Sequence, residues 1–104
     1  MTRYSRGADF ERKVKADLQA NGWFVVRSAG SHGPVDLIAQ APGPSIAWIQ
    51  CKRDGKMSGR DQTDIINLAK AFDAIPILAY KDNGVCYSEL FADRKMDWTP
   101  GEAA

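Results

Sequence analysis

The sequence predicts an α/β domain of the α+β kind, in which a mixed sheet of about five strands is flanked by helices. Two segments repeat apolar residues at helical spacing, and the other ordered segments are short runs rich in β-branched and aromatic residues. Their order is α-β-β-β-α-β-β. A chain of 104 residues with 44% hydrophobic residues fits one compact core. We assign residues 1–96 to a single domain and expect 97–104 to be a mobile tail.

The first helix is predicted between Gly7 and Asn21. Phe10, Val14 and Leu18 recur at every fourth position with charged residues between them. This spacing gives one apolar stripe, and the Asn-Gly pair at its end is typical of a helix C-terminus.

Three strands are expected next. Residues 23–27 are aromatic and β-branched, and the small and turn-forming residues of 28–34 indicate a loop after them. Residues 35–40 and 46–52 are two further strand-like runs. The segment between these two runs contains two prolines and a glycine, which cannot continue a ladder, so we expect a hairpin.

A second helix is predicted to begin near Arg60, after a polar and glycine-containing segment. Its apolar face is formed by Ile65, Leu68, Ala69 and Phe72. Two strands follow at 75–80 and 85–91, and the Asn-Gly pair between them suits a tight hairpin.

The net charge of +1 hides an uneven distribution of charge. Residues 1–60 hold ten Lys and Arg against five acidic residues, whereas residues 61–104 hold four against eight. A basic first part can face a phosphate backbone while the acidic remainder favours solubility. Chance clustering on a solvated surface is the alternative explanation.

Several classes of protein are disfavoured by the sequence. No apolar run approaches the roughly 20 residues of a membrane span. The charged start lacks the apolar segment of a secretory signal, so we expect a cytoplasmic protein. Cys51 and Cys86 have no neighbour at zinc or redox spacing, which favours reduced, buried thiols.

One constellation can carry hydrolytic chemistry. Asp36 lies near the start of one predicted strand of the hairpin, and Gln50 and Lys52 lie at the end of the other. Because strand side chains alternate, Gln50 and Lys52 share a face and Cys51 points to the other. Oxygen ligands can hold Mg²⁺, which activates water, while an ammonium stabilises the developing phosphorane charge. Glu11 offers a second carboxylate.

Each of these residues also has an ordinary structural explanation. Asp36 could cap a turn, Lys52 could be a solvated strand end, and Glu11 could pair with Lys15 one helical turn away. Their combination is what favours a site.

Four ordered blocks resemble the motifs of archaeal-type Holliday junction resolvases, in the PD-(D/E)xK nuclease superfamily. The blocks are RGADFER at 6–12, VVRSAGS at 25–31, PVDLIA at 34–39 and IQCK at 49–52, and IPILAY at 75–80 is similar to the following core strand. The resemblance covers about residues 3–90. It implies a restriction-endonuclease-like core and a dimeric endonuclease, dependent on Mg²⁺ with Mn²⁺ as substitute, that recognises four-way junction DNA. Neither a membrane nor a small-molecule substrate is implied.

The resemblance also implies roles for individual residues. Asp36 and Gln50 would be metal ligands, Glu11 would assist at the metal, and Lys52 would be the catalytic lysine. The expected contacts to the DNA are made by Arg6, Arg12, Arg27, Ser28, Ser31, Arg53 and Lys56. The family pattern usually has Glu where this chain has Gln50, a Gln-x-Lys variant, and a neutral amide is a poorer Mg²⁺ ligand than a carboxylate.

Two other functions stay open at this point. The first is a non-catalytic DNA-binding module that has lost a good metal site, which Gln50 motivates. The second is an Mrr- or repair-type nuclease with another DNA substrate, because the Gln-x-Lys form is similar to that of Mrr-type enzymes. His32, the single histidine, is expected to be an exposed loop residue or a phosphate contact rather than a general acid. Trp23 and Trp48 are expected in the core, with base stacking as the alternative.

Overall fold

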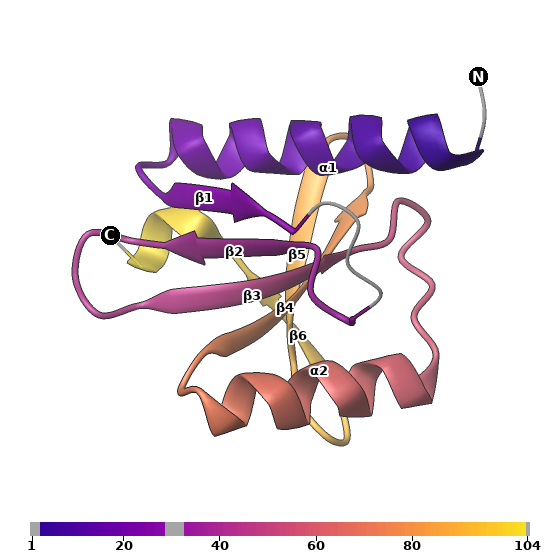
Figure 1. Ribbon diagram of the computed structural model, residues 1–104, viewed down its shortest axis with the longest axis vertical. Helices are drawn as coiled ribbons and strands as arrows, with labels where there is room; N and C mark the ends of the chain where they lie inside the picture. The colour runs from indigo at the N-terminus through magenta and orange to yellow at the C-terminus, as the bar shows by residue number, and fades with distance from the viewer. Residues whose placement is uncertain (1–2, 29–32, 104) are drawn as a thin grey trace.

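A computed structural model describes residues 3–28 and 33–103, with the side chains of 7–28 and 33–101. In these residues it contains two α-helices, six strands and a short 3-10 helix (Figure 1). The elements are α1 (Arg3–Ala20), β1 (Phe24–Arg27), β2 (Leu37–Gln40), β3 (Ile46–Cys51), α2 (Gly59–Ala71), β4 (Ile75–Lys81), β5 (Val85–Leu90), β6 (Lys95–Trp98) and η1 (Pro100–Ala103).

The strands form one mixed sheet whose spatial order follows the chain, from β1 at one edge to β6 at the other. Every neighbouring pair is antiparallel except β3 and β4. These two are parallel because α2 carries the chain back across the sheet between them. The expected mixed α/β architecture is therefore confirmed.

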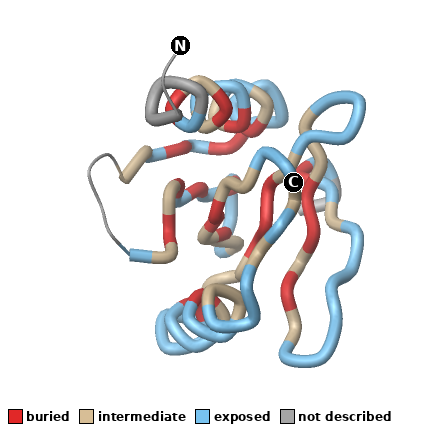
Figure 2. Tube along the Cα trace, turned by 90° about the vertical axis from the view of Figure 1, so that its right-hand side faces the viewer, coloured by how far each residue is buried: buried red, intermediate tan, exposed pale blue. Residues whose placement is uncertain are grey.

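The helices cover opposite faces of the sheet, as Figure 1 shows. Strand β4 contributes to both faces: Ile77 and Ala79 belong to the core under α1, while Leu78 and Tyr80 pack with Ile65 of α2. Burial on both faces explains why the central strands are almost continuously apolar. In Figure 2 the buried residues follow the strands and the inward stripes of both helices.

The sheet has one strand more than the five predicted, and this strand changes the account of the C-terminus. Asp97 and Trp98, expected in a mobile tail, belong to β6, and the domain does not end at residue 96. Trp98 meets Trp23 edge to face at 5.6 Å between ring centroids. Trp23 Nε1 also donates a hydrogen bond of 3.0 Å to the carbonyl of Pro100. These long-range contacts order a charged segment with little strand propensity of its own.

Two predicted boundaries are shifted by two residues or more, and several others by one. The first helix begins at Arg3 rather than Gly7. The second strand begins at Leu37, two residues after the predicted start at Val35. Among the described residues, no helix is long and apolar enough to cross a membrane. The two cysteines are free and half-buried, and Trp23 is a core residue as expected.

Candidate functional site

Asp36 is fixed at the end of the sheet by hydrogen bonds on both sides. Its carbonyl accepts from the amide of Ser28 at 2.8 Å, and its own amide donates to the carbonyl of Ile49 at 2.8 Å. The carboxylate Oδ2 accepts from the amide of Cys51, also at 2.8 Å. The backbone between β1 and β3 therefore sets the position of this side chain.

The residues on either side of Asp36 pack on opposite faces of the sheet. Val35 packs in the core beside α2, whereas Leu37 packs in the core beneath α1. Residues two apart in a regular strand share a face, so the strand pattern is broken at the residue between them. This is why β2 begins at Leu37, and it leaves Asp36 at the rim between the two cores.

Gln50 lies across the ladder from Asp36. Leu37 pairs with Ile49 at the end of the β2–β3 ladder, and the two polar residues are the next positions outward. The Gln50 side chain is 8% exposed. Its Oε1 atom is buried and has no hydrogen-bond partner among the described residues. A buried amide oxygen without a donor costs free energy, so a ligand for it is expected.

Lys52 follows β3 on the same side as Gln50, as the alternation predicted. Its amide donates to the carbonyl of Ala79 at 2.9 Å, which extends the contact between β3 and β4. Its Nζ atom lies 3.8 Å from Oδ2 of Asp61. The ammonium is half-exposed, so it can reach a bound anion.

Asp61 is a site residue that the sequence reasoning missed. It stands in the first turn of α2, where its amide donates to Oγ of the N-cap residue Ser58 at 3.0 Å. The Ser-x-x-Asp spacing resembles a capping box and could have placed this carboxylate at the helix start. Only the structure brings it to Lys52.

Glu11 reaches the same end of the sheet from α1. Its Oε2 atom lies 3.6 Å from Nη2 of Arg27, and both side chains are largely buried. The Nε atom of Arg27 is buried without a hydrogen-bond partner among the described residues. Glu11 therefore pairs with Arg27 of β1 rather than with Lys15, the ordinary structural alternative for this residue.

Both carboxyl groups are poised to accept a proton or a cation. Burial raises the pKa of Asp36, and the hydrogen bond from Cys51 and the charges of Lys52 and Arg27 lower it only in part. Burial and then the negative charge of Asp36 raise the pKa of Glu11, against the opposing charge of Arg27. The two carboxylates therefore repel each other in a poorly solvated place.

These residues fit a hard divalent cation. In the described part of the chain, no group of three or more His, Cys, Asp and Glu side chains gathers as a metal site. Two mutually repelling carboxylates and the unpartnered oxygen of Gln50 nevertheless form an oxygen donor set, which suits Mg²⁺ when water and phosphate complete the shell.

Only some of the remaining residues predicted to contact DNA lie near Asp36 and Lys52. Arg12 is exposed and pairs with Asp9 at 3.1 Å. Arg53 and Lys56 are exposed in the loop after β3. The predicted contacts Arg6, Ser31 and His32 fall outside the described side chains.

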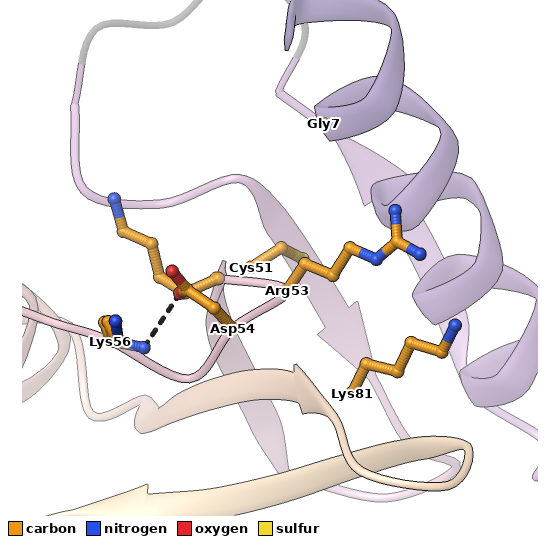
Figure 3. Close-up of a pocket in the computed structure, with 7 residues that line it drawn as sticks. Gly7, Cys51, Arg53, Asp54, Lys56 and Lys81 are labelled. Atoms are coloured by element: carbon orange, nitrogen blue, oxygen red, sulfur yellow. Dashed lines mark hydrogen bonds between the residues drawn. The ribbon is translucent and has the colours of Figure 1, made fainter.

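A groove of about 810 Å³ opens beside Lys52. Figure 3 shows Arg53 and Lys81 directed toward α1 from the loop after β3 and from the end of β4. The groove is lined by Gly7, Cys51, Lys52, Arg53, Asp54, Lys56 and Lys81. Neither Gly7 nor Lys81 was singled out from the sequence.

The profile of the family described as archaeal Holliday junction resolvase (Hjc) matches residues 2–100. The chain is 38% identical over 86 residues to a protein named crossover junction endodeoxyribonuclease Hjc from Methanocaldococcus jannaschii. That match covers 79% of this chain and 63% of the relative's length.

The fold is similar to that of the Archaeoglobus fulgidus protein Hjc, which is described as a Holliday junction resolvase. The TM-score is 0.68 at 22% sequence identity, with 94% of this chain and 88% of that chain covered. At this identity the likeness concerns the fold alone.

The raised pKa of Asp36 predicts an effect of pH on stability. At a pH above the pKa that Asp36 has in the unfolded chain, the folded state is destabilised by the cost of burying the charged Asp36 carboxylate. The free energy of unfolding should fall as pH rises through the folded pKa, and Asp36→Asn should remove this part of the fall. Urea unfolding of both proteins between pH 4 and pH 7 is the measurement, with Asp93→Asn as the exposed control. Identical pH profiles for Asp36→Asn and the parent would contradict the assignment.

Proposed function

The chain belongs to the archaeal Holliday junction resolvase family, and on that premise we propose that it is a structure-selective endonuclease. It would hydrolyse phosphodiester bonds of four-way junction DNA. The observation that carries the proposal is the proximity of the Asp36 carboxylate to Glu11 and Lys52, with Gln50 at the strand position opposite Asp36. The chain spans 63% of the length of its curated relative. The junction substrate and the partners of this chain are therefore proposed. Action on DNA agrees with the expected cytoplasmic location.

The proposed cofactor is Mg²⁺, with Mn²⁺ as a substitute. Asp36 and Gln50 would hold the ion and Glu11 would assist, directly or through water. A bound Mg²⁺ supplies a water of lowered pKa and a partner for the phosphate oxygen. The cation would also relieve the repulsion between the two carboxylates, which raises the pKa of Glu11 in its absence.

The chain's own residues have separate tasks. Lys52 would place its ammonium against the charge that develops on the phosphorane, and Asp61 would hold that ammonium in position. Arg27, held by Glu11, would contact the phosphate beside the scissile bond. The backbone amide of Cys51 keeps the Asp36 carboxylate from turning away.

The DNA would be recognised mainly through its backbone and shape. The proposed contacts are Arg6, Arg12, Arg27, Ser28, Ser31, Arg53 and Lys56. Exposed arginine and lysine side chains bind phosphate without reading base edges, so junction geometry would carry selectivity.

A homodimer is the proposed assembly, and an exposed apolar face supports it. Phe24 and Val26 of β1, Ile38 of β2 and Phe72 after α2 are exposed, and Phe72 stacks on Trp48 at 5.2 Å between ring centroids. Register pairs Val26 with Ile38 and Ile38 with Trp48, so the face is continuous. A contiguous apolar face of this kind is typical of a subunit contact. Two copies related by a two-fold axis would match the symmetry of a junction.

One alternative function has an observation in its favour. Gln50 stands where a carboxylate is expected, so the same fold could bind junctions without cutting them. Its buried, unpartnered oxygen argues for a working site, since an inert relic gains nothing from leaving that atom without a donor.

We expect Asp36→Asn and Lys52→Ala to abolish cleavage while leaving junction binding within about threefold of the parent. Each removes a group at the reacting phosphate and leaves the exposed groove cations Arg53, Lys56 and Lys81 in place. Cleavage of labelled junction and duplex DNA in Mg²⁺ or EDTA measures the first effect, and gel-shift titration in EDTA the second. Asp36→Asn that cuts as fast as the parent would show that the site is misplaced.

Gln50→Glu separates the working enzyme from the relic. The added negative charge should tighten divalent-metal binding at the carboxylates. In a working enzyme the parent cuts junctions, and the variant lowers the Mg²⁺ concentration needed for half-maximal rate by roughly tenfold. A parent that binds junctions tightly yet makes no cut in Mg²⁺ or Mn²⁺ would favour the relic.

Light scattering should give twice the chain mass of 11.4 kDa for the parent. Phe24→Ser, at a side chain 72% exposed on the apolar face, should shift the protein toward the monomer. Met96→Ser is the matched control, because that side chain is 50% exposed on β6 at the other edge of the sheet. A parent that is a strict monomer with and without junction DNA would overturn the dimer.

A further inference from the structure

The groove beside Lys52 is built from three separate segments of the chain. Gly7 of α1 forms one side, and the loop after β3 and the end of β4 form the other. The amide of Lys81 donates to the carbonyl of Arg53 at 3.0 Å, so these two residues are held next to each other by the backbone. Their side chains both extend toward α1 (Figure 3). The groove is therefore a fixed feature of the sheet end.

The groove carries positive charge that the described part of the chain leaves unneutralised. Arg53, Lys56 and Lys81 are exposed and take part in none of the ion pairs among the described side chains. Among the described lining residues the one acid is Asp54, which accepts a hydrogen bond from the backbone amide of Lys56 at 3.0 Å. Three cations around an open groove of this size favour an extended anion.

Gly7 lines the α1 side of the groove and leaves free space there. A Cβ atom placed there would meet no heavy atom within 4 Å. The absence of a side chain in the middle of a helix costs stability, about 1 kcal/mol relative to alanine. Because Gly7 lines the groove, a longer side chain at this position is expected to enter the space beside Arg53 and Lys81.

We propose that this groove holds the phosphodiester backbone of the junction next to the scissile phosphate, with Arg53 and Lys81 as its phosphate contacts. The inference rests on the proposed function, since Lys52 belongs both to the catalytic site and to the groove lining. A strand whose scissile phosphate lies at Asp36 and Lys52 continues past Lys52 into the groove. Backbone charge is the feature recognised, because the cations are exposed and the described lining residues include no aromatic ring on which a base could stack.

The first test measures binding to an uncut four-way junction in EDTA at several salt concentrations. Arg53→Gln and Lys81→Gln should each weaken binding about fivefold to tenfold at 0.1 M salt. Each should also lower the slope of log K against log salt by about 1. Lys70→Gln, at the far end of α2, removes the same charge outside the groove and should change affinity less than twofold. Equal losses for all three variants would show that net charge alone acts, and would overturn the groove.

Gly7 provides a matched pair that differs only in charge. Gly7→Glu should weaken junction binding about tenfold relative to Gly7→Gln, because it puts a carboxylate opposite Arg53 and Lys81. Both variants should melt no lower than the parent, since either residue favours a helix over glycine. Equal affinities of the Glu and Gln variants would contradict the proposal.

Neutral methylphosphonate linkages can locate the contact. The linkages are placed one at a time around the scissile phosphate. A linkage that faces the groove should weaken junction binding by the parent but have little further effect on junction binding by Lys81→Gln. Additive losses at every linkage would overturn the inference. A parent protein that binds no junction at all would instead overturn the proposed function, so the two failures are distinguishable.

Discussion

Side-chain alternation along β3 determines both the core and the candidate site. Ala47 and Ile49 pack under α1, Trp48 packs toward α2, and the same two-sided pattern continues in the parallel neighbour β4. Because both faces of these strands are buried, neither can slip by one residue without moving apolar side chains to the wrong face. The polar residues at the end of β3 are therefore held in register by the apolar residues before them, and the precision of the site comes from the core.

The site is built at a cost in stability. Asp36 keeps a carboxylate in a poorly solvated place, and Gln50 buries an oxygen that receives no hydrogen bond from the described residues. Each feature alone disfavours folding. They persist because the backbone hydrogen bonds of Ser28, Ile49 and Cys51 fix the chain around Asp36 without using its second carboxylate oxygen. The arrangement leaves oxygen acceptors of two neighbouring positions, Asp36 and Gln50, without a hydrogen bond from the backbone of the described residues.

Much of this architecture could be predicted from local patterns, and the exceptions have physical reasons. The helix stripe of Phe10, Val14 and Leu18 is buried as expected, and Gln50 and Lys52 share a face because period-two alternation holds to the end of β3. Strand β6 was missed because its order comes from long-range contacts of Trp98 rather than from its own residues. The Lys52–Asp61 pair was missed for a similar reason: it joins two elements whose approach depends on the crossover of α2.

The three candidate surfaces lie on different parts of the sheet: Asp36 is next to the Arg27–Leu37 end of the β1–β2 ladder, whereas Phe24 is at the opposite end. The cationic groove lies on the side of α1, where Cys51 and Gly7 line it. The apolar face lies on the opposite side of β1 and β2, where Phe24 and Ile38 are left uncovered by α2. Asp36 lies at the rim of the sheet between the two cores, since Val35 packs beside α2 and Leu37 packs beneath α1. In the proposed dimer a partner on the apolar face would leave both grooves open, so each copy could take one strand of a symmetric junction. The separation of charge from apolar surface would thus let the proposed subunit pairing and the proposed DNA binding use different residues.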